Sequence, residues 1–171
     1  MVVAFWQVQR LTRELNDLRK QAMQVTTRLT NHQKYAGVLG GSSILNLGNI
    51  AGLSAEILPR ATLFAQFSDQ ASSMSAMQNL QMMKMMGRVP MTGNPMMQMQ
   101  LEFSAFNKFK QEALKALKQQ EITQMNEIEK EIQLELNGIE QRIKIKEKQL
   151  ESYKALADKQ VDSMVPTFGL R

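Results

Sequence analysis

A ladder of apolar residues with alternating spacings of four and three runs through the first thirty residues. Its members are Val8, Leu11, Leu15, Leu18, Ala22, Val25 and Leu29, and it extends to His32 and Ala36. A period of 3.5 residues is typical of a coiled-coil seam, along which one helix packs against another. We therefore predict one helix over residues 1–36, with Val8, Leu11, Leu15, Leu18, Val25 and Leu29 as its seam. A plain amphipathic helix on a globular core is the alternative interpretation.

Glycines and serines follow this helix and predict its end. Gly37, Gly40 and Gly41 precede Ser42 and Ser43, and the next residues are apolar but rich in Gly and Asn. We interpret residues 37–58 as a compact bulge in the chain. Its aliphatic side chains have too little of their own chain to cover them, so we expect them to be buried against a neighbouring subunit: Ile44, Leu45, Leu47, Ile50 and Leu53.

A second helix is predicted over residues 59–87. Pro59 suits its first turn, Gly87 suits its end, and Pro90 prevents its continuation. The apolar stripe expected to face the rest of the protein contains Leu63, Phe64, Phe67, Ala71, Met74, Met77 and Leu80 or Met83. Residues 88–94 then form a short turn.

A long third helix is predicted over residues 95–164, with a tail at 165–171. Asn94 and Pro95 form an N-cap and a first-turn proline, and no further proline occurs before Pro166. The apolar seam of its second half contains Ile132, Leu136, Ile139, Ile143 and Leu150. Asn137-Gly138 is the one weak point, where a kink is possible.

These lengths predict the fold. The first two helices together nearly match the third, and a short turn makes the second and third antiparallel neighbours. The fold class is therefore all-α: an elongated antiparallel helical hairpin or coiled coil, in which one long C-terminal helix packs against two shorter N-terminal helices in a single domain. The hairpin places residue 73 near residue 109, so the small side chains of residues 71–76 face Phe103, Phe106 and Phe109.

The residue types that carry chemistry are scarce. The chain has no cysteine and one histidine, His32, on the predicted seam. No phosphate-binding loop, nucleophile elbow or HExxH motif occurs. The acidic run at residues 127–135 includes Lys130 and is typical of a solvated helix face. We predict no catalytic, cofactor-binding or metal-binding residues and no enzymatic activity.

The charge distribution limits the possible partners. The net charge is +5, and the basic excess is spread thinly over the first hundred residues, so nucleic acid is an improbable partner. Residues 36–58 are the best membrane candidate, but glycines, asparagines and Glu56 interrupt them, so membrane contact is possible but not favoured. The N-terminal residues lack the pattern of a secretory signal. We expect a location in the cytoplasm, inside a virion, or outside the cell by a route without a signal.

Methionine is concentrated in one region. Ten of the fourteen methionines lie between Met74 and Met99. Soft thioether side chains suit a contact surface that must adapt to its partner. The alternatives are packing within the hairpin itself, binding of soft metals, and binding of apolar peptides. The last would resemble, in composition alone, the methionine-rich domain of signal-recognition-particle proteins, whose basic RNA-binding signature is absent here.

The favoured function is that of a structural subunit that assembles with copies of itself, and with other proteins of the same assembly, into a filament, tube, virion or secretion structure. The architecture is similar in kind to needle-type secretion subunits and phage internal proteins. The predicted assembly interface consists of Phe5, Trp6, Ile44, Leu45, Leu47, Ile50, Leu53, Met83, Met86, Met91, Met97 and Met99. The alternatives are a chaperone or scaffold that binds apolar clients through the methionines, and a membrane-active translocator that uses residues 36–58.

Overall fold

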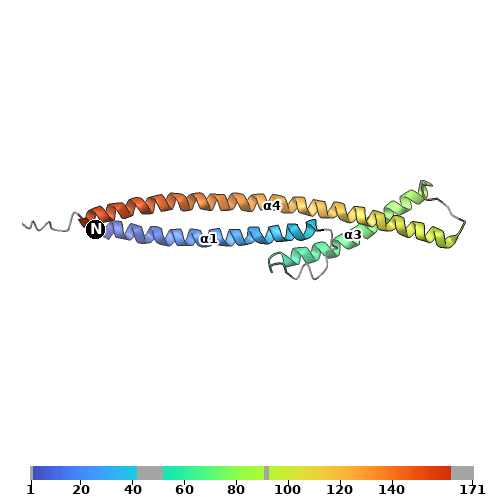
Figure 1. The fold of residues 1–171 in the computed structure, drawn as a ribbon, viewed down its shortest axis with the longest axis horizontal. Helices are drawn as coiled ribbons and strands as arrows, with labels where there is room; N and C mark the ends of the chain where they lie inside the picture. Colours follow the sequence, from blue (N-terminus) through green and yellow to red (C-terminus); the bar gives the residue numbers. More distant parts are fainter. Residues whose placement is uncertain (1, 42–51, 91–92, 163–171) are drawn as a thin grey trace, which may run out of the picture. The chain divides into compact units, whose positions relative to one another are not determined.

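The computed structural model describes residues 2–41, 52–90 and 93–162, and within them it contains three α-helices and no strand. These are α1 (Val2–Gly40), α3 (Leu58–Met85) and α4 (Pro95–Asp162), shown in Figure 1. The long C-terminal α4 packs against the two shorter N-terminal helices, which confirms the predicted fold class.

The starts of α3 and α4 follow from their local sequences. Ile57 is the N-cap of α3, and Pro59 lies in the first turn, where its missing N–H costs nothing. Asn94 caps α4, because its Oδ1 accepts a 3.0 Å hydrogen bond from the backbone N–H of Met96. Both starts were predicted from the proline that follows each cap.

The end of α3 is a Schellman motif. Gly87 has a φ of +64°, in the left-handed region that favours glycine. The N–H of Gly87 donates to the carbonyl of Lys84 at 3.1 Å, and the N–H of Arg88 donates to that of Met83 at 3.0 Å. These two bonds satisfy carbonyls that the end of the helix would otherwise leave without a partner.

Helix α1 ends later than expected, and α4 lacks the kink that was considered within it. Helix α1 continues four residues beyond residue 36. The extra turn is stabilised because it places Leu39 in the same buried core as Tyr35. The helix therefore tolerates Gly37. Helix α4 runs without interruption through Asn137 and Gly138, where a kink was considered.

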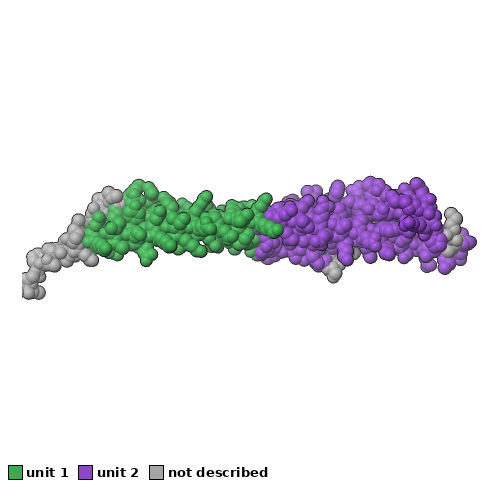
Figure 2. Space-filling view, turned by 90° about the horizontal axis from the view of Figure 1, so that it is seen from above, with its two compact units in different colours: residues 1–30, 130–171 green, residues 31–129 purple. Residues whose placement is uncertain are grey.

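The chain forms two compact units, coloured separately in Figure 2. The first unit contains residues 1–30 and 130–171, and its described part consists of residues 2–30 of α1 and the second half of α4, residues 130–162. The eleven residues predicted as seam are buried or half-buried there: Val8, Leu11, Leu15, Leu18, Val25, Leu29, Ile132, Leu136, Ile139, Ile143 and Leu150. The two segments are antiparallel, since Arg28 pairs with Glu135 and Arg19 with Glu147.

The second unit, residues 31–129, contains the end of α1, all of α3 and the first half of α4. Its core consists of Tyr35, Leu39, Ile57, Ala61 and Met125. All three helices and the turn before α3 therefore contribute to this core. Leu53, expected at the interface with a neighbour, is half-buried and packs against this core.

Helix α3 packs in a way that the apolar pattern did not predict. Its buried residues are Ala61, Ser68, Ser72 and Ala76, whereas much of the predicted stripe is exposed: Leu63, Phe67, Met74 and Met77. The prediction of the inward face was wrong for these four residues. Small side chains allow two helices to approach closely and receive larger side chains from the partner. Phe106 and Phe109 on α4 are accordingly half-buried, while Phe103 is exposed.

Candidate assembly surfaces

The charged residues of α3 all pair with α4. The helix contains three, Arg60, Asp69 and Lys84, and each pairs with a residue of α4. These pairs are Arg60 with Glu121 at 2.6 Å, Asp69 with Lys110 at 2.8 Å, and Lys84 with Glu102 at 2.6 Å. The predicted register, residue 73 near residue 109, lies between the second and third pairs. The charges of α3 are thus directed to α4, which leaves the opposite face neutral.

The opposite face of α3 carries an apolar stripe. We call Leu63, Phe67, Met74 and Met77 the outer stripe; their exposed fractions are 66%, 70%, 61% and 58%. On a helix of 3.6 residues per turn these positions fall within a sector of about 80°, roughly opposite Ala61 and Ser72. Their spacing follows a 3.5-residue period with Gln70 in the middle, which is the pattern of a coiled-coil seam. No part of the described chain covers this seam.

A second apolar surface surrounds the connection between α3 and α4. We call it the methionine surface, and its exposed members are Met82, Met85, Met86, Met96, Met97 and Met99. Met85 is 83% exposed and Met99 is 73% exposed. Adjacent methionines point about 100° apart on a helix, so one contact between two helices cannot bury them all.

The predicted interface residues therefore have different environments. Met86, Met97 and Met99 are exposed, and Met83 is half-buried. Phe5 and Trp6, on α1, are 51% and 54% exposed, and the guanidinium of Arg10 lies 5.5 Å from the centre of the Trp6 ring. This cation–π contact covers one face of the indole. Five further predicted residues lie outside the described ones: Ile44, Leu45, Leu47, Ile50 and Met91.

A buried polar network in the second unit was not predicted from the sequence. Oε1 of Glu121 accepts hydrogen bonds from the Tyr35 hydroxyl at 3.2 Å and from Nε of Arg60 at 2.6 Å. Arg60 also donates to Oε1 of Gln124 at 3.1 Å. Burial, reinforced by the Glu121 charge, raises the pKa of the Tyr35 phenol, and the hydrogen bond to Glu121 raises the pKa of Arg60. The network joins all three helices at one point.

A lysine on the seam of the first unit was also missed. Lys146 lies between Ile143 and Leu150 at the spacing of a seam position, where the apolar pattern has a gap. Its Nζ is 2.6 Å from Oε2 of Glu14, and both side chains are about one third exposed. This hydrogen bond is the main reason that the pKa of Glu14 is lowered. A single charged residue on a seam specifies alignment at some cost in stability.

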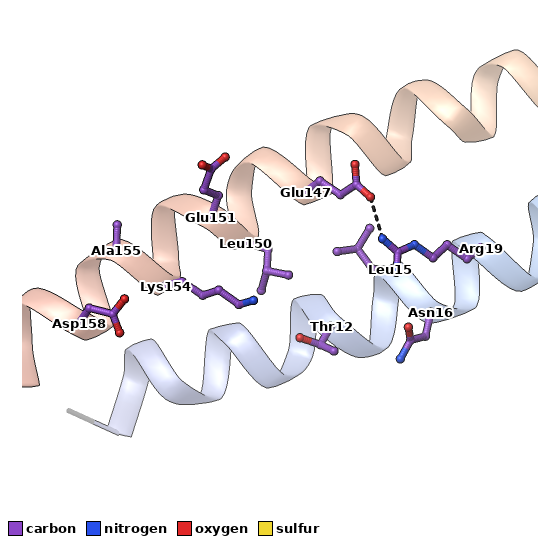
Figure 3. A pocket seen from close by; sticks show the side chains of 10 residues that line it. All are labelled: Thr12, Leu15, Asn16, Arg19, Glu147, Leu150, Glu151, Lys154, Ala155 and Asp158. Atoms are coloured by element: carbon purple, nitrogen blue, oxygen red, sulfur yellow. Dashed lines mark hydrogen bonds and ion pairs between the residues drawn. The ribbon is translucent and has the colours of Figure 1, made fainter.

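The first unit also contains a surface hollow of about 580 Å³ between α1 and α4 (Figure 3). Arg19 and Glu147 pair at its edge, and Leu15 and Leu150 form its floor near the seam. The hydroxyl of Thr12 donates to the backbone carbonyl of Val8 at 2.8 Å, so it is engaged within its own helix. The hollow contains charges of both signs but no general base beside a nucleophile.

The described residues contain neither a metal-binding cluster nor a membrane-spanning helix. Within residues 2–41, 52–90 and 93–162, no three His, Cys, Asp or Glu side chains converge so as to hold a metal ion. None of the helices described is both long and apolar enough to cross a membrane. Ten residues of the candidate membrane segment, 42–51, lie outside this part of the chain.

Comparison with known proteins does not assign a family. No protein-family model matches the chain, and no curated protein or solved structure shows significant similarity to it. The exposed surfaces described above are therefore the basis for a functional assignment.

Proposed function

We propose that the protein is a non-enzymatic structural subunit that assembles with copies of itself through its exposed apolar surfaces. The observation that carries this proposal is the methionine surface. Six methionines within eighteen residues of sequence are each more than half exposed. Large apolar side chains that stay exposed in such number within one region are typical of interaction sites.

The chemistry of the surface suits repeated contacts. Methionine is unbranched and polarisable, so it adapts to neighbours that differ slightly from one contact to the next. Burial of one such side chain contributes about 1.5–3 kcal/mol, which makes a small number of them sufficient for association. Lys84 lies among these methionines, but its charge is neutralised by Glu102.

Concentration-dependent sedimentation tests the proposal. The wild type is expected to form larger species as its concentration rises. A variant with Met85, Met86, Met97 and Met99 changed to Gln is expected to shift association to at least tenfold higher concentration, with unchanged helicity because Gln is a comparable helix former. The matched control changes four exposed apolar residues that are scattered over the first unit, Met23, Leu134, Ile145 and Leu156, to Gln, and should associate like the wild type.

Other outcomes would redirect the proposal. A wild type that remains monomeric at all concentrations contradicts self-assembly. Retention of apolar peptides by that monomer, lost in the methionine variant, would favour the chaperone interpretation instead. A loss of helicity in the methionine variant would show that these side chains stabilise the α3–α4 pair itself.

A further inference from the structure

We infer that α3 is a second, separate dimerisation element, which pairs with α3 of a second copy in an antiparallel arrangement through the outer stripe. The inference rests on the proposed function and specifies one of its contacts. It concerns the face of α3 that is opposite α4, whereas the methionine surface lies around the connection between these helices.

The first argument is the spacing of the outer stripe. Positions 63, 67, 70, 74, 77 and 81 alternate in steps of four and three, and they are occupied by Leu63, Phe67, Gln70, Met74, Met77 and Gln81. These six positions correspond to the contact positions of three heptads in a coiled-coil seam. The other face of α3 is already used, because Ala61, Ser68, Ser72 and Ala76 are buried. The helix therefore has one seam for its own chain and another that requires a partner helix.

The second argument is charge. All three charged residues of α3 are paired with α4, and the stretch from Leu63 to Gln81 contains only one of them, Asp69. A partner that binds this face needs no complementary charge. A chain with a net charge of +5 repels its own copies over most orientations, so a neutral apolar face is where two copies can meet with the least repulsion. A strongly charged partner would gain nothing from this face.

The third argument is symmetry. The six seam positions are symmetric about residue 72, so the stripe is complementary to itself when a second copy runs in the opposite direction. In that arrangement Phe67 lies opposite Met77 of the second copy, and Gln70 lies opposite Met74 of the second copy. Thioether sulfur against an aromatic ring is a favourable contact. Opposed helix macrodipoles also favour the antiparallel direction over the parallel one.

Disulfide trapping tests the direction of pairing. The chain has no cysteine, so each introduced cysteine reports on one position. Gln70→Cys and Met74→Cys variants, one of them carrying a mass tag, are oxidised alone and as a mixture. The antiparallel pairing predicts mixed disulfide dimers at least tenfold in excess of either homodimer. Homodimers of each variant in place of mixed dimers would establish parallel pairing and overturn the inference.

Substitution of the outer stripe separates this inference from the proposed function. A variant with Leu63, Phe67, Met74 and Met77 changed to Gln is expected to lose the trapped dimer and to weaken dimerisation at least tenfold, with unchanged helicity. If this variant associates like the wild type while the methionine variant does not, the inference is wrong and the proposed function stands. If the wild type never associates, both are wrong. If the stripe variant is less stable without any change in association, the stripe is covered within its own chain, which also overturns the inference.

Discussion

Glu121 of α4 accepts the Nε–H of Arg60 from α3 at 2.6 Å, on the same oxygen that accepts the hydroxyl of Tyr35 from α1. One carboxylate oxygen thus joins three helices. The Glu121 side chain is 10% exposed and that of Arg60 is 37% exposed, so the pair is stronger than one at the surface but is still partly hydrated.

Removal of the Glu121 charge should destabilise the second unit. We expect Glu121→Gln to lower the free energy of unfolding by about 1.5–3 kcal/mol, because a charged hydrogen bond is lost and Arg60 keeps no carboxylate. Tyr35→Phe should cost about 1 kcal/mol, and the two effects should not add in the double variant. Urea unfolding measures all three. A cost no larger than that of Glu131→Gln, at an exposed position of α4, would contradict the role of the network.

The end of α3 offers a test of backbone conformation. Gly87 adopts a φ of +64°, where a side chain costs about 1–2 kcal/mol, although no atom would obstruct a Cβ at this position. We therefore expect Gly87→Ala to destabilise the protein by that amount, and Gly87→Asn by less. Gly93→Ala, in the same connection but without a left-handed φ, is the control and should be nearly neutral. Equal effects at both glycines in thermal unfolding would exclude the Schellman motif as the cause.

Gly138 should be replaceable with a gain. It lies inside α4, and a Cβ built there meets nothing within 4 Å. Gly138→Ala is expected to stabilise the protein by about 1 kcal/mol, because alanine loses less backbone entropy on entering a helix. Thermal unfolding followed by circular dichroism measures the change. A loss of stability instead would indicate that the backbone at Gly138 departs from a regular helix in solution.

Lys146 should influence how α1 and α4 align along their seam more than it influences the stability of the first unit. Lys146→Leu completes the apolar seam and is expected to raise the melting temperature by about 2–4 °C. It should also permit additional associated species, since the charged residue no longer penalises other alignments. Sedimentation at matched concentrations detects these species, and Lys144→Leu, at an exposed position, is the control. A lower melting temperature would mean that the pair with Glu14 outweighs the cost of a lysine on the seam.

Acid should weaken both units. Hydrogen bonds from Lys146 and Lys84 hold the pKa of Glu14 and of Glu102 below the ordinary value of 4.5. Because the unfolded chain binds protons at a higher pH than the folded chain, the stabilisation is complete above pH 4.5 and is lost as the pH falls through the lowered pKa values. Melting temperatures between pH 7 and pH 3 test this. Glu14→Gln and Glu102→Gln should each reduce the acid-induced drop, and an unchanged drop in both would refute the assignment.

The helices could be predicted because their signals are local. The ladder from Val8 to Leu29, the cap at Asn94 and the proline at position 59 each act within a few residues. The inward face of α3 was predicted only in part: residues 71–76 were expected to face α4, but so was the apolar stripe, and the structure buries the small residues alone. The apolar periodicity favours Phe67 and Met74 as the buried residues. Close helix packing and the ion pairs to α4 instead favour burial of the small side chains, such as Ala61 and Ser72.

The buried network was missed for a related reason. The 3.5-residue ladder predicted Ala36 as its last member, but the α1 face turns as it approaches a third helix, and Tyr35 and Leu39 become the buried residues instead. Tyr35 is 86 residues from its partner Glu121, and Arg60, the other donor to Glu121, is 61 residues from it; none of the three belongs to a recognisable motif. Polar residues that pair across a long stretch of sequence produce no periodic pattern from which the pair could be predicted.

The pairing of Glu14 with Lys146, 132 residues along the chain, has a consequence for biosynthesis. A ribosome releases α1 long before the segment that covers its seam, whereas α3 and the start of α4 are made close together and can pair early. Throughout that interval Leu11, Leu15 and Val25 have no partner on their own polypeptide. The seam of α1 is therefore covered only after the last part of α4 has been made.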